Sequence, residues 1–259
     1  MLLDLSNMIK IFSADLKTSQ FITITQSILG LVGIVYFLAT QQYDYFYFSL
    51  IVSMFTSQLS HNVGLHKYFS HNSFETNKFW HIFLCLVAPL HCAGSPVSYA
   101  VAHRTHHAYS DTNKDPHSPT IGLLKVVFYK WNLEHVSVKF MKGLTDPWMA
   151  FSHKWYALII LCFVLILGFI DPMLIIAYST SIVFSKIGGT MTNYVCHLEH
   201  NNFNYRNFDT TDHSSNNLIT GLIFGEWHNN HHANPKNWNQ RVKWWEFDLS
   251  AQLIKVIKQ

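Results

Sequence analysis

Long stretches without a single charged side chain constrain this sequence more than any other feature. Residues 21–40 and 45–66 contain no Lys, Arg, Asp or Glu, and about 20 apolar residues are enough for a helix to cross the roughly 30 Å hydrocarbon core of a bilayer. Two further windows, 155–170 and 173–196, are similar, although the first has only 16 residues and the second contains Lys186. Charged residues make up 13% of the chain, about half of the roughly 25% typical of soluble domains. We therefore expect lipid to cover much of the surface.

Short polar linkers join these windows in pairs. Residues 41–44 separate the first two windows, and Asp171-Pro172 separates the last two. Connections this short join helices that run antiparallel to each other. The sequence therefore predicts an all-α integral membrane protein, a single domain over residues 1–259, with four transmembrane helices in two hairpins: 21–40, 45–66, 155–170 and 173–196. Lys186 would either reach toward the membrane interface or point into the bundle.

Histidine is the second unusual feature, because its 17 copies outnumber the 15 acidic side chains. Eight of them form three clusters: His66 and His71 in HKYFSH, His103, His106 and His107 in HRTHH, and His228, His231 and His232 in HNNHH. Positions i, i+3 and i+4 share one face of a helix, so each HxxHH cluster is expected to aim its imidazoles at a common point. The HxxxxH pair would lie about 140° apart on an α-helix, so we expect it to serve two metals or to sit where a helix ends.

The number and type of these ligands indicate the kind of site. Imidazole suits iron, copper, zinc or nickel, and eight histidines exceed the needs of one ion, so the sequence predicts two metal ions. The clusters contain no thiolate, which argues against a structural zinc site. A histidine-rich metal-transport protein is an alternative, but its ligands should line a path within the membrane. The four cysteines form no CxxC pair, and we expect all of them to be reduced and buried: Cys85, Cys92, Cys162 and Cys196.

A fifth uncharged window, residues 79–102, separates the first histidine cluster from the second. If this window crossed the bilayer, His71 and His103 would lie on opposite sides of the membrane and could not share one metal site. Gly94-Ser95-Pro96 also interrupts the window near its end, as glycine and proline do in helices. We therefore expect an interfacial or re-entrant element rather than a fifth span.

The distribution of Lys and Arg predicts the orientation in the membrane. The two hairpin turns contain neither residue, whereas the segments that carry the histidine clusters contain many, and positive residues favour the cytoplasmic side. We therefore expect both termini, and a cap formed by residues 103–154 and 197–259 with the metal site, to be cytoplasmic. The first 20 residues are mixed and polar, unlike a cleavable signal. The net charge is only +3 without a long basic run, so no nucleic acid partner is expected.

Longer motifs surround these histidines. The chain carries HKYFSH at 66–71, GSPVSYAVAHRTHHAYSDTNKDPHSP at 94–119, GEWHNNHHANP at 225–235 and WWEFDL at 244–249. They resemble the HRxxSH, GGPxxWxxxHRxHHxxSDTxxDPH, GEGWHNNHHxxP and WWExDL motifs of the membrane-bound fatty acid desaturases, in particular the Δ9-type acyl desaturases. The resemblance covers about residues 45–253. Lys67 replaces an arginine of that pattern, Tyr99 replaces a tryptophan, and one glycine before Trp227 is missing.

The resemblance implies further site residues. An Asn-x-x-x-His element of the family is matched by Asn193 and His197, which implies His197 as a ninth ligand and Asn193 as a metal contact through water. The alignment of Lys67 and Ser70-His71 favours His66 over His61, which lies five residues earlier. Three residues are expected to support the site from behind the ligands: Asp115, His117 and Glu226. The remaining histidines are expected to be structural or on the surface: His81, His91, His135, His153, His200 and His213.

The resemblance also implies an activity. Two iron ions (Fe²⁺/Fe³⁺), reduced by external electrons, would react with O₂, and two hydrogens would leave adjacent methylenes of an acyl chain to give a cis double bond and water. The sequence shows no haem or ferredoxin-like module, so we expect a separate electron donor such as ferredoxin or a b-type cytochrome. The acyl carrier (CoA, carrier protein or lipid), the substrate-binding residues and the bond position stay open. The nearest alternative is a fatty acyl or alkyl hydroxylase on the same scaffold.

Overall fold

The computed structural model describes residues 5–119, 122–123, 137–198 and 202–259. These residues are mostly helical, as the sequence predicts. The first half contains α1 (Leu5–Ala39), α2 (Tyr43–Phe55), η1 (Thr56–Ser70), α3 (Lys78–Val87), η2 (Ala88–His91) and α4 (Pro96–Tyr109). The second half contains η4 (Val138–Met141), α6 (Pro147–Lys154), α7 (Tyr156–Ile170), α8 (Met173–Cys196), α9 (Leu218–Phe224), α10 (His228–Ala233) and α11 (Leu249–Ile257), with the antiparallel strands β1 (Asn204–Tyr205) and β2 (Asn216–Asn217).

Two helices are long and apolar enough to cross a membrane, namely α8 and the part of α1 from Lys17 to Ala39. Two pairs of shorter helices would each qualify if counted together, but each pair is bent, by 70° between α6 and α7 and by 73° between the α3–η2 segment and α4. The described residues therefore contain two to four candidate spans. The predicted span 45–66 falls on α2 and η1, which follow each other directly and are not among these candidates.

Some of the predicted membrane windows coincide with helices of the structure, and others differ from them at one end. The window 173–196 coincides with α8, and the window 155–170 differs from α7 by one residue. Helix α1 begins 16 residues before the window 21–40, at Leu5. In η1 the helical hydrogen bonds are of the wider π type, which continues the second helix to Ser70 and so places His66 within it.

The window 79–102 is divided, as the glycine and proline in it predict. Cys92 and Gly94 have positive φ angles of 61° and 114° after η2. The Ser95 side chain then accepts a hydrogen bond from the backbone N–H of Ser98, and Pro96 occupies the first turn of α4, two features that start a helix. Helix α4 continues to Tyr109, so the predicted boundary between this segment and the cap, at residue 102, falls within a helix. The placement of this segment at the membrane interface stays a prediction.

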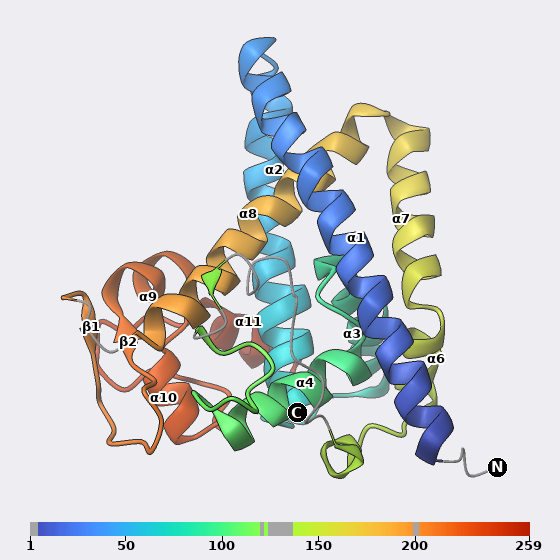
Figure 1. Ribbon diagram of the computed structural model, residues 1–259. Helices are drawn as coiled ribbons and strands as arrows, with labels where there is room; N and C mark the ends of the chain where they lie inside the picture. Colours follow the sequence, from blue (N-terminus) through green and yellow to red (C-terminus); the bar gives the residue numbers. More distant parts are fainter. Residues whose placement is uncertain (1–4, 120–121, 124–136, 199–201) are drawn as a thin grey trace.

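Small residues bring α1 and α8 into close contact where they cross (Figure 1). A Cβ atom on Gly30 would lie 2.2 Å from the carbonyl oxygen of Ser179, and one on Gly33 would lie 2.3 Å from Thr180 Oγ1. Near this crossing Lys186 points into the bundle, where its Nζ donates to Thr23 Oγ1 at 2.9 Å and to the carbonyl of Cys92 at 3.3 Å. Of the two positions predicted for this lysine, the structure therefore shows the inward one.

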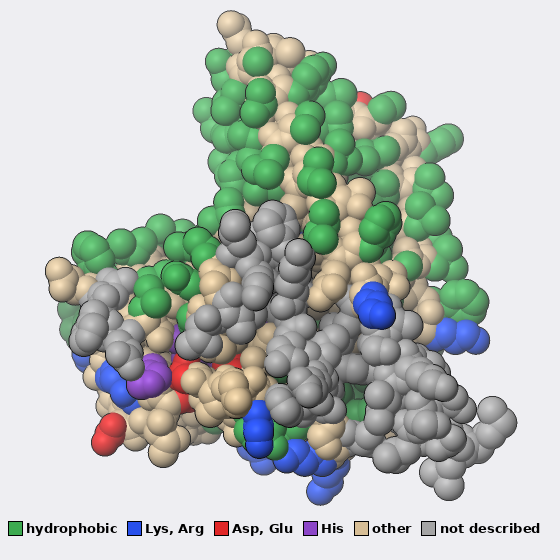
Figure 2. All heavy atoms as spheres, viewed as in Figure 1, with side chains coloured by type: hydrophobic (Ala, Val, Ile, Leu, Met, Phe, Trp, Pro, Cys, Tyr) green, Lys and Arg blue, Asp and Glu red, His purple; other side chains and the backbone are tan. Residues whose placement is uncertain are grey.

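The molecule separates apolar from charged surface. Figure 2 shows hydrophobic side chains over the upper part, while Lys and Arg gather over the lower part. Phe169 of α7 is 93% exposed and Val35 of α1 is 68% exposed, as expected for side chains that face lipid. Cys85, Cys92 and Cys196 are buried free thiols, but Cys162 is exposed. The prediction of four buried cysteines was therefore wrong for Cys162. This residue lies on α7, where Tyr156 and Ile160 are the buried residues and most of the helix surface does not contact the rest of the protein.

Candidate metal centre

Nine imidazoles from four parts of the chain converge below the α8 helix. His66 and His71 come from the end of η1, His103, His106 and His107 from α4, His197 from the end of α8, and His228, His231 and His232 from α10. They form two groups within which each residue offers a nitrogen less than 4.8 Å from the others. We name them the five-histidine position (His66, His71, His103, His107 and His231) and the four-histidine position (His106, His197, His228 and His232).

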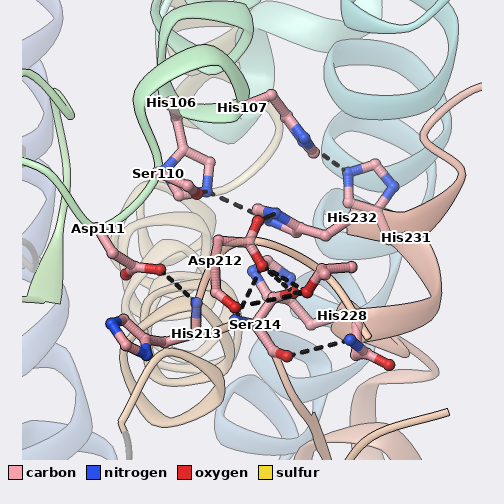
Figure 3. A network of polar contacts seen from close by, with 12 residues as sticks. His106, His107, Ser110, Asp111, Asp212, His213, Ser214, His228, His231 and His232 are labelled. Atoms are coloured by element: carbon pink, nitrogen blue, oxygen red, sulfur yellow. Dashed lines mark hydrogen bonds and ion pairs between the residues drawn. The ribbon is translucent and has the colours of Figure 1, made fainter. Parts of the chain in front are cut away.

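Each HxxHH cluster divides between the two positions. In α4, His103 and His107 belong to the five-histidine position and His106 to the other; in α10, His228 and His232 belong to the four-histidine position and His231 to the other. The expectation that each cluster aims at one common point was therefore wrong. Figure 3 shows His106 and His107 of α4 opposite His231 and His232 of α10. At about 100° per residue, side chains four apart on a helix differ by about 40° and side chains three apart by about 60°, so the i, i+4 pairs stay together.

The pair His66 and His71 lies in one position, not in two. Their ring centroids are 5.2 Å apart, and His71 is the residue at which η1 ends. Hydrogen bonds from residue i to residue i+5, which define a π-helix, bring side chains five residues apart into register. Of the two sequence-based interpretations of HxxxxH, the helix end therefore holds and the division between two metals does not.

The spacing of the nitrogens fits a bound cation. In the five-histidine position the Nε2 atoms of His66–His231, His231–His107, His107–His103 and His103–His71 are 2.9, 2.9, 3.1 and 2.9 Å apart. In the other position the corresponding distances are 2.9 Å for His197–His228 and 3.4 Å for His106–His232. Two ligands about 2.1 Å from one metal are about 3.0 Å apart at right angles and about 3.4 Å apart in a tetrahedron.

Hydrogen bonds alone do not explain this convergence. His103 Nε2 faces both His71 and His107, and His231 Nε2 faces both His66 and His107, although a neutral imidazole carries a single proton. Burial, reinforced by neighbouring imidazoles, lowers the pKa of His103, His107 and His232 well below the usual value. Burial and then the Arg104 guanidinium lower the pKa of His71 to about 3. These four rings are therefore neutral near pH 7, the state that binds metal.

Carboxylates lie next to the Nδ1 atoms of several rings, on the side away from the other imidazoles. Asp115 Oδ2 accepts from His106 Nδ1 at 2.9 Å, and the Glu226 carboxylate lies 3.7 Å from His228 Nδ1 and 3.9 Å from His66 Nδ1. The His117 ring stacks on His106 with centroids 4.2 Å apart. The structure thus places all three residues predicted to support the site directly behind ligand candidates. It adds two that the sequence reasoning missed, Asp111 behind His197 and Asp212 behind His232.

Asn193 lies one helical turn before His197 on α8. Its Nδ2 donates to the backbone carbonyl of His117 at 3.2 Å, and it lines a cavity that also contacts His66, His103 and His228. Ligand candidates from both positions therefore open onto one cavity, together with Tyr99 and Glu226. A contact between Asn193 and a metal through water stays a prediction.

The other histidines that the structure describes have partners outside the two positions. His61 Nε2 lies 2.8 Å from the Tyr99 hydroxyl, which donates to it when Asn62 Oδ1 accepts from His61 Nδ1. His81 contacts Asp146 and Tyr68, His91 contacts Ser185, His153 contacts Ser95, and the exposed His213 donates its backbone N–H to Asp111. His135 and His200 lie outside the described residues.

Comparisons with known proteins agree with this site. The family model for fatty acid desaturases matches residues 43–255. The sn-1 stearoyl-lipid 9-desaturase of Anabaena variabilis is 29% identical over 81% of this chain and 79% of its own. The Hex-5-enoyl-[acyl-carrier protein] acetylenase of Moorena producens is 28% identical over 79% of this chain and 72% of its own. The Icosanoyl-CoA 5-desaturase of Limnanthes douglasii is 29% identical over 83% of this chain and 63% of its own.

The family match includes every residue of the two histidine positions and covers far more than half of the chain. The histidine groups, the helices apolar enough for a membrane and these relatives all lead to one assignment. The chain therefore belongs to the fatty acid desaturase family and is an oxidoreductase that acts as a fatty acyl desaturase.

Proposed function

We propose that this protein is an O₂-dependent di-iron desaturase that introduces a cis double bond into a saturated fatty acyl chain, with Δ9-type selectivity. The observation that carries the proposal is the convergence of five and four imidazoles on two adjacent positions that open onto one cavity. An all-nitrogen ligand set of this size suits a redox metal. Two positions side by side match a reaction that consumes several electrons at once.

The nine imidazoles would hold two iron ions, and Asn193 would contact one of them through water. When bound, the irons supply the O₂-dependent chemistry that removes hydrogen from an unactivated methylene. The overall reaction balances when one acyl chain, one O₂, two electrons and two protons give one alkene and two waters. The protein's own residues position the acyl chain beside the metals and keep bulk water out of the cavity, whose walls include the buried residues His66, His103 and His228.

Relatives with different names support the desaturase reaction without fixing its details. The names of the two desaturases give position 9 or 5, and the three names together give a lipid, CoA or a carrier protein as the group that holds the acyl chain. We propose Δ9 selectivity because the motifs around the histidines follow that subgroup.

Electrons are proposed to come from a separate donor such as ferredoxin or a b-type cytochrome. Both termini and the metal centre are proposed to face the cytoplasm, with the protein spanning the membrane several times.

Expression in a host that lacks its own desaturase tests the activity. We expect new monounsaturated acyl chains in the host lipids, with the double bond at carbon 9 when the products are mapped by mass spectrometry. A His231→Ala variant expressed at the same level is the control, and it should give no new alkene. Hydroxylated acyl chains would instead support a hydroxylase. An unchanged lipid profile, despite iron-loaded protein and a supplied electron donor, would contradict the enzyme assignment.

A further inference from the structure

We propose that the two metal positions are electrostatically unlike: three aspartates behind the four-histidine position make it the tighter iron site and the one with the lower reduction potential. This inference rests on the proposed di-iron function. It assigns a role to Asp111, Asp115 and Asp212 as positioning residues that act through the imidazoles they contact.

Three of the four imidazoles in the four-histidine position donate their Nδ1 proton to an aspartate. His106 donates to Asp115 at 2.9 Å, His197 to Asp111 Oδ2 at 3.1 Å and His232 to Asp212 at 2.7 Å. A carboxylate in this place fixes the tautomer, so the Nε2 lone pair faces the metal, and it makes that nitrogen a stronger donor. The fourth ring, His228, has the Glu226 carboxylate 3.7 Å from its Nδ1.

These aspartates are themselves held in place. Asp115 also accepts backbone N–H groups of His117 at 3.0 Å and of Asp111 at 3.2 Å. Asp111 accepts the backbone N–H of His213 at 2.8 Å, and its φ of 62° lies in the left-handed region that non-glycine residues rarely adopt. Carboxylates bonded on both sides keep their direction, so their contact with the imidazoles is a fixed property of the fold.

Asp212, on the more exposed side of the site, is likewise held by hydrogen bonds from neighbouring residues. Its Oδ1 accepts the backbone N–H of Ser214 at 3.1 Å and the hydroxyl of Thr210 at 2.8 Å, while its Oδ2 accepts from His232. Figure 3 shows Asp212 and Ser214 together beside His232. The residues that hold Asp212 lie within two positions of it in the sequence, so a substitution of its carboxylate leaves the surrounding loop with most of its contacts.

The five-histidine position has no such anions. Among the described residues, no carboxylate oxygen lies within 4.0 Å of the ring nitrogens of His71, His103, His107 or His231, and the one near His66 is Glu226 at 3.9 Å. The buried Nδ1 atoms of His66 and His231 have no hydrogen-bond partner in the described part of the chain, and in the four-histidine position this holds for His228 alone.

A cation lies beside the five-histidine position instead. The Arg104 guanidinium donates to the backbone carbonyls of Phe69 and Ser70, next to His71, and within the described residues its hydrogen bonds go to backbone carbonyls alone. One position therefore has three anions hydrogen-bonded to its ligands, and the other has neutral rings and a nearby cation for which the described residues supply no carboxylate partner. Negative charge stabilises the more positive oxidation state of a metal, so the two positions should differ in affinity and in potential.

Titration of the metal-free full-length protein in detergent with ⁵⁷Fe²⁺ alone, without oxygen, tests this difference. We expect the first equivalent to bind at least tenfold more tightly than the second and to give a single Mössbauer doublet. A His71→Ala variant should keep this tight site, whereas His228→Ala should lose it. Two ions that bind with equal affinity in the wild-type protein, or a tight site that survives His228→Ala, would overturn the proposal.

Asp212→Asn tests the charge itself, because asparagine keeps an oxygen that can accept from His232. We expect the dissociation constant of the tight site to rise about 10- to 100-fold, with a changed Mössbauer doublet and a higher midpoint potential, and Asp212→Glu to restore part of the affinity. The matched control is Asp209→Asn, since Asp209 is fully exposed and its only ion pair among the described residues is with Arg206, at 4.0 Å. Equal effects of the two asparagine variants would refute the role of Asp212. These readouts are independent of alkene formation, so the failure of the inference and the failure of the proposed function are distinguishable.

Discussion

At the scale of single residues, the partner of each histidine's second nitrogen decides what the ring can do. His61 and His66 lie on the same helix, the first half-buried and the second buried, with ring centroids 6.1 Å apart. His66 presents its Nε2 to His231, whereas both nitrogens of His61 are engaged by Tyr99 and Asn62. Spacing along the sequence cannot separate the two, since each begins an HxxxxH pattern. The surrounding side chains make the difference.

His61→Phe is therefore expected to leave the iron content of the purified protein unchanged, because the ring donates no lone pair to either position. His231→Ala, in contrast, should remove one of two irons, since it deletes a nitrogen that faces both His66 and His107. The measurement is iron per chain by elemental analysis after gel filtration. Loss of iron in His61→Phe would show that His61 is a metal ligand after all.

Lys67 forms a buried network next to the site. Its Nζ donates to Asp248 Oδ2 at 2.7 Å, to Ser250 Oγ at 2.6 Å and to the carbonyl of Trp238 at 2.9 Å. Lys67→Met should lower the free energy of unfolding by about 3–5 kcal/mol, because it leaves the Asp248 charge buried without a cation. The double variant Lys67→Met/Asp248→Asn should recover part of this loss, since asparagine still caps α11. Apparent melting temperatures in detergent check both, and a double variant no better than the single one would contradict the argument.

At the scale of elements, the crossing of α1 and α8 depends on glycine where backbone meets backbone. Gly30→Ala should destabilise the protein by about 1–3 kcal/mol, because its Cβ would meet the Ser179 carbonyl, which cannot rotate away. Gly189→Ala is the matched control: its Cβ would meet only His61, at 3.9 Å, and alanine favours the helix by about 0.5–1 kcal/mol. The two substitutions should thus shift the melting temperature in opposite directions. A shift of the same sign would show that the helices do not approach this closely.

The segment between α10 and α11 is organised around the Glu246 carboxylate. It accepts from Tyr205 at 2.6 Å and from Asn207, Asn230 and the backbone N–H groups of Val242 and Lys243 at 2.7–2.9 Å. Burial by itself would raise the pKa of Glu246, but these hydrogen bonds lower it below the usual value of 4.5. The carboxylate therefore stabilises the fold above pH 4.5, and this contribution is lost as the pH falls through the lowered pKa.

Glu246→Gln should consequently lower the melting temperature at pH 7, and the difference from the wild-type protein should shrink once the pH falls below the pKa of Glu246. The comparison needs melting curves at several pH values between 7 and 3. Glu75→Gln, at an exposed position, is the control and should show no such pH dependence. A constant difference across the range would mean that the charge of Glu246 does not stabilise this segment.

At the scale of the whole molecule, the metal centre constrains the path of the chain through the membrane. His71 and His103, on either side of the segment 79–102, present their Nε2 atoms to each other at 2.9 Å. The two ends of that segment therefore lie on the same side of the protein, although its composition is as apolar as that of a membrane span. The 73° bend between its two halves is consistent with this return.

Labelling of single cysteines in a cysteine-free background checks the topology. Glu75→Cys and Lys114→Cys, both at exposed positions that flank the returning segment, should react with an impermeant maleimide only from the cytoplasmic face. Thr40→Cys, at the turn that follows α1, should react only from the opposite face. Labelling of positions 75 and 114 from different faces would show that the segment crosses the bilayer.

The sequence by itself determined the helical class, the apolar segments and the histidines that can bind metal, because hydropathy and spacing are local properties. Tertiary structure decided which histidines share a position. The division of His103, His106 and His107 depends on how α4 faces α10, and Asp111 reaches His197 across 86 residues of chain. Since side-chain contacts between distant segments leave no periodic trace in a sequence, the charge placed behind each metal position could be found only in the folded protein.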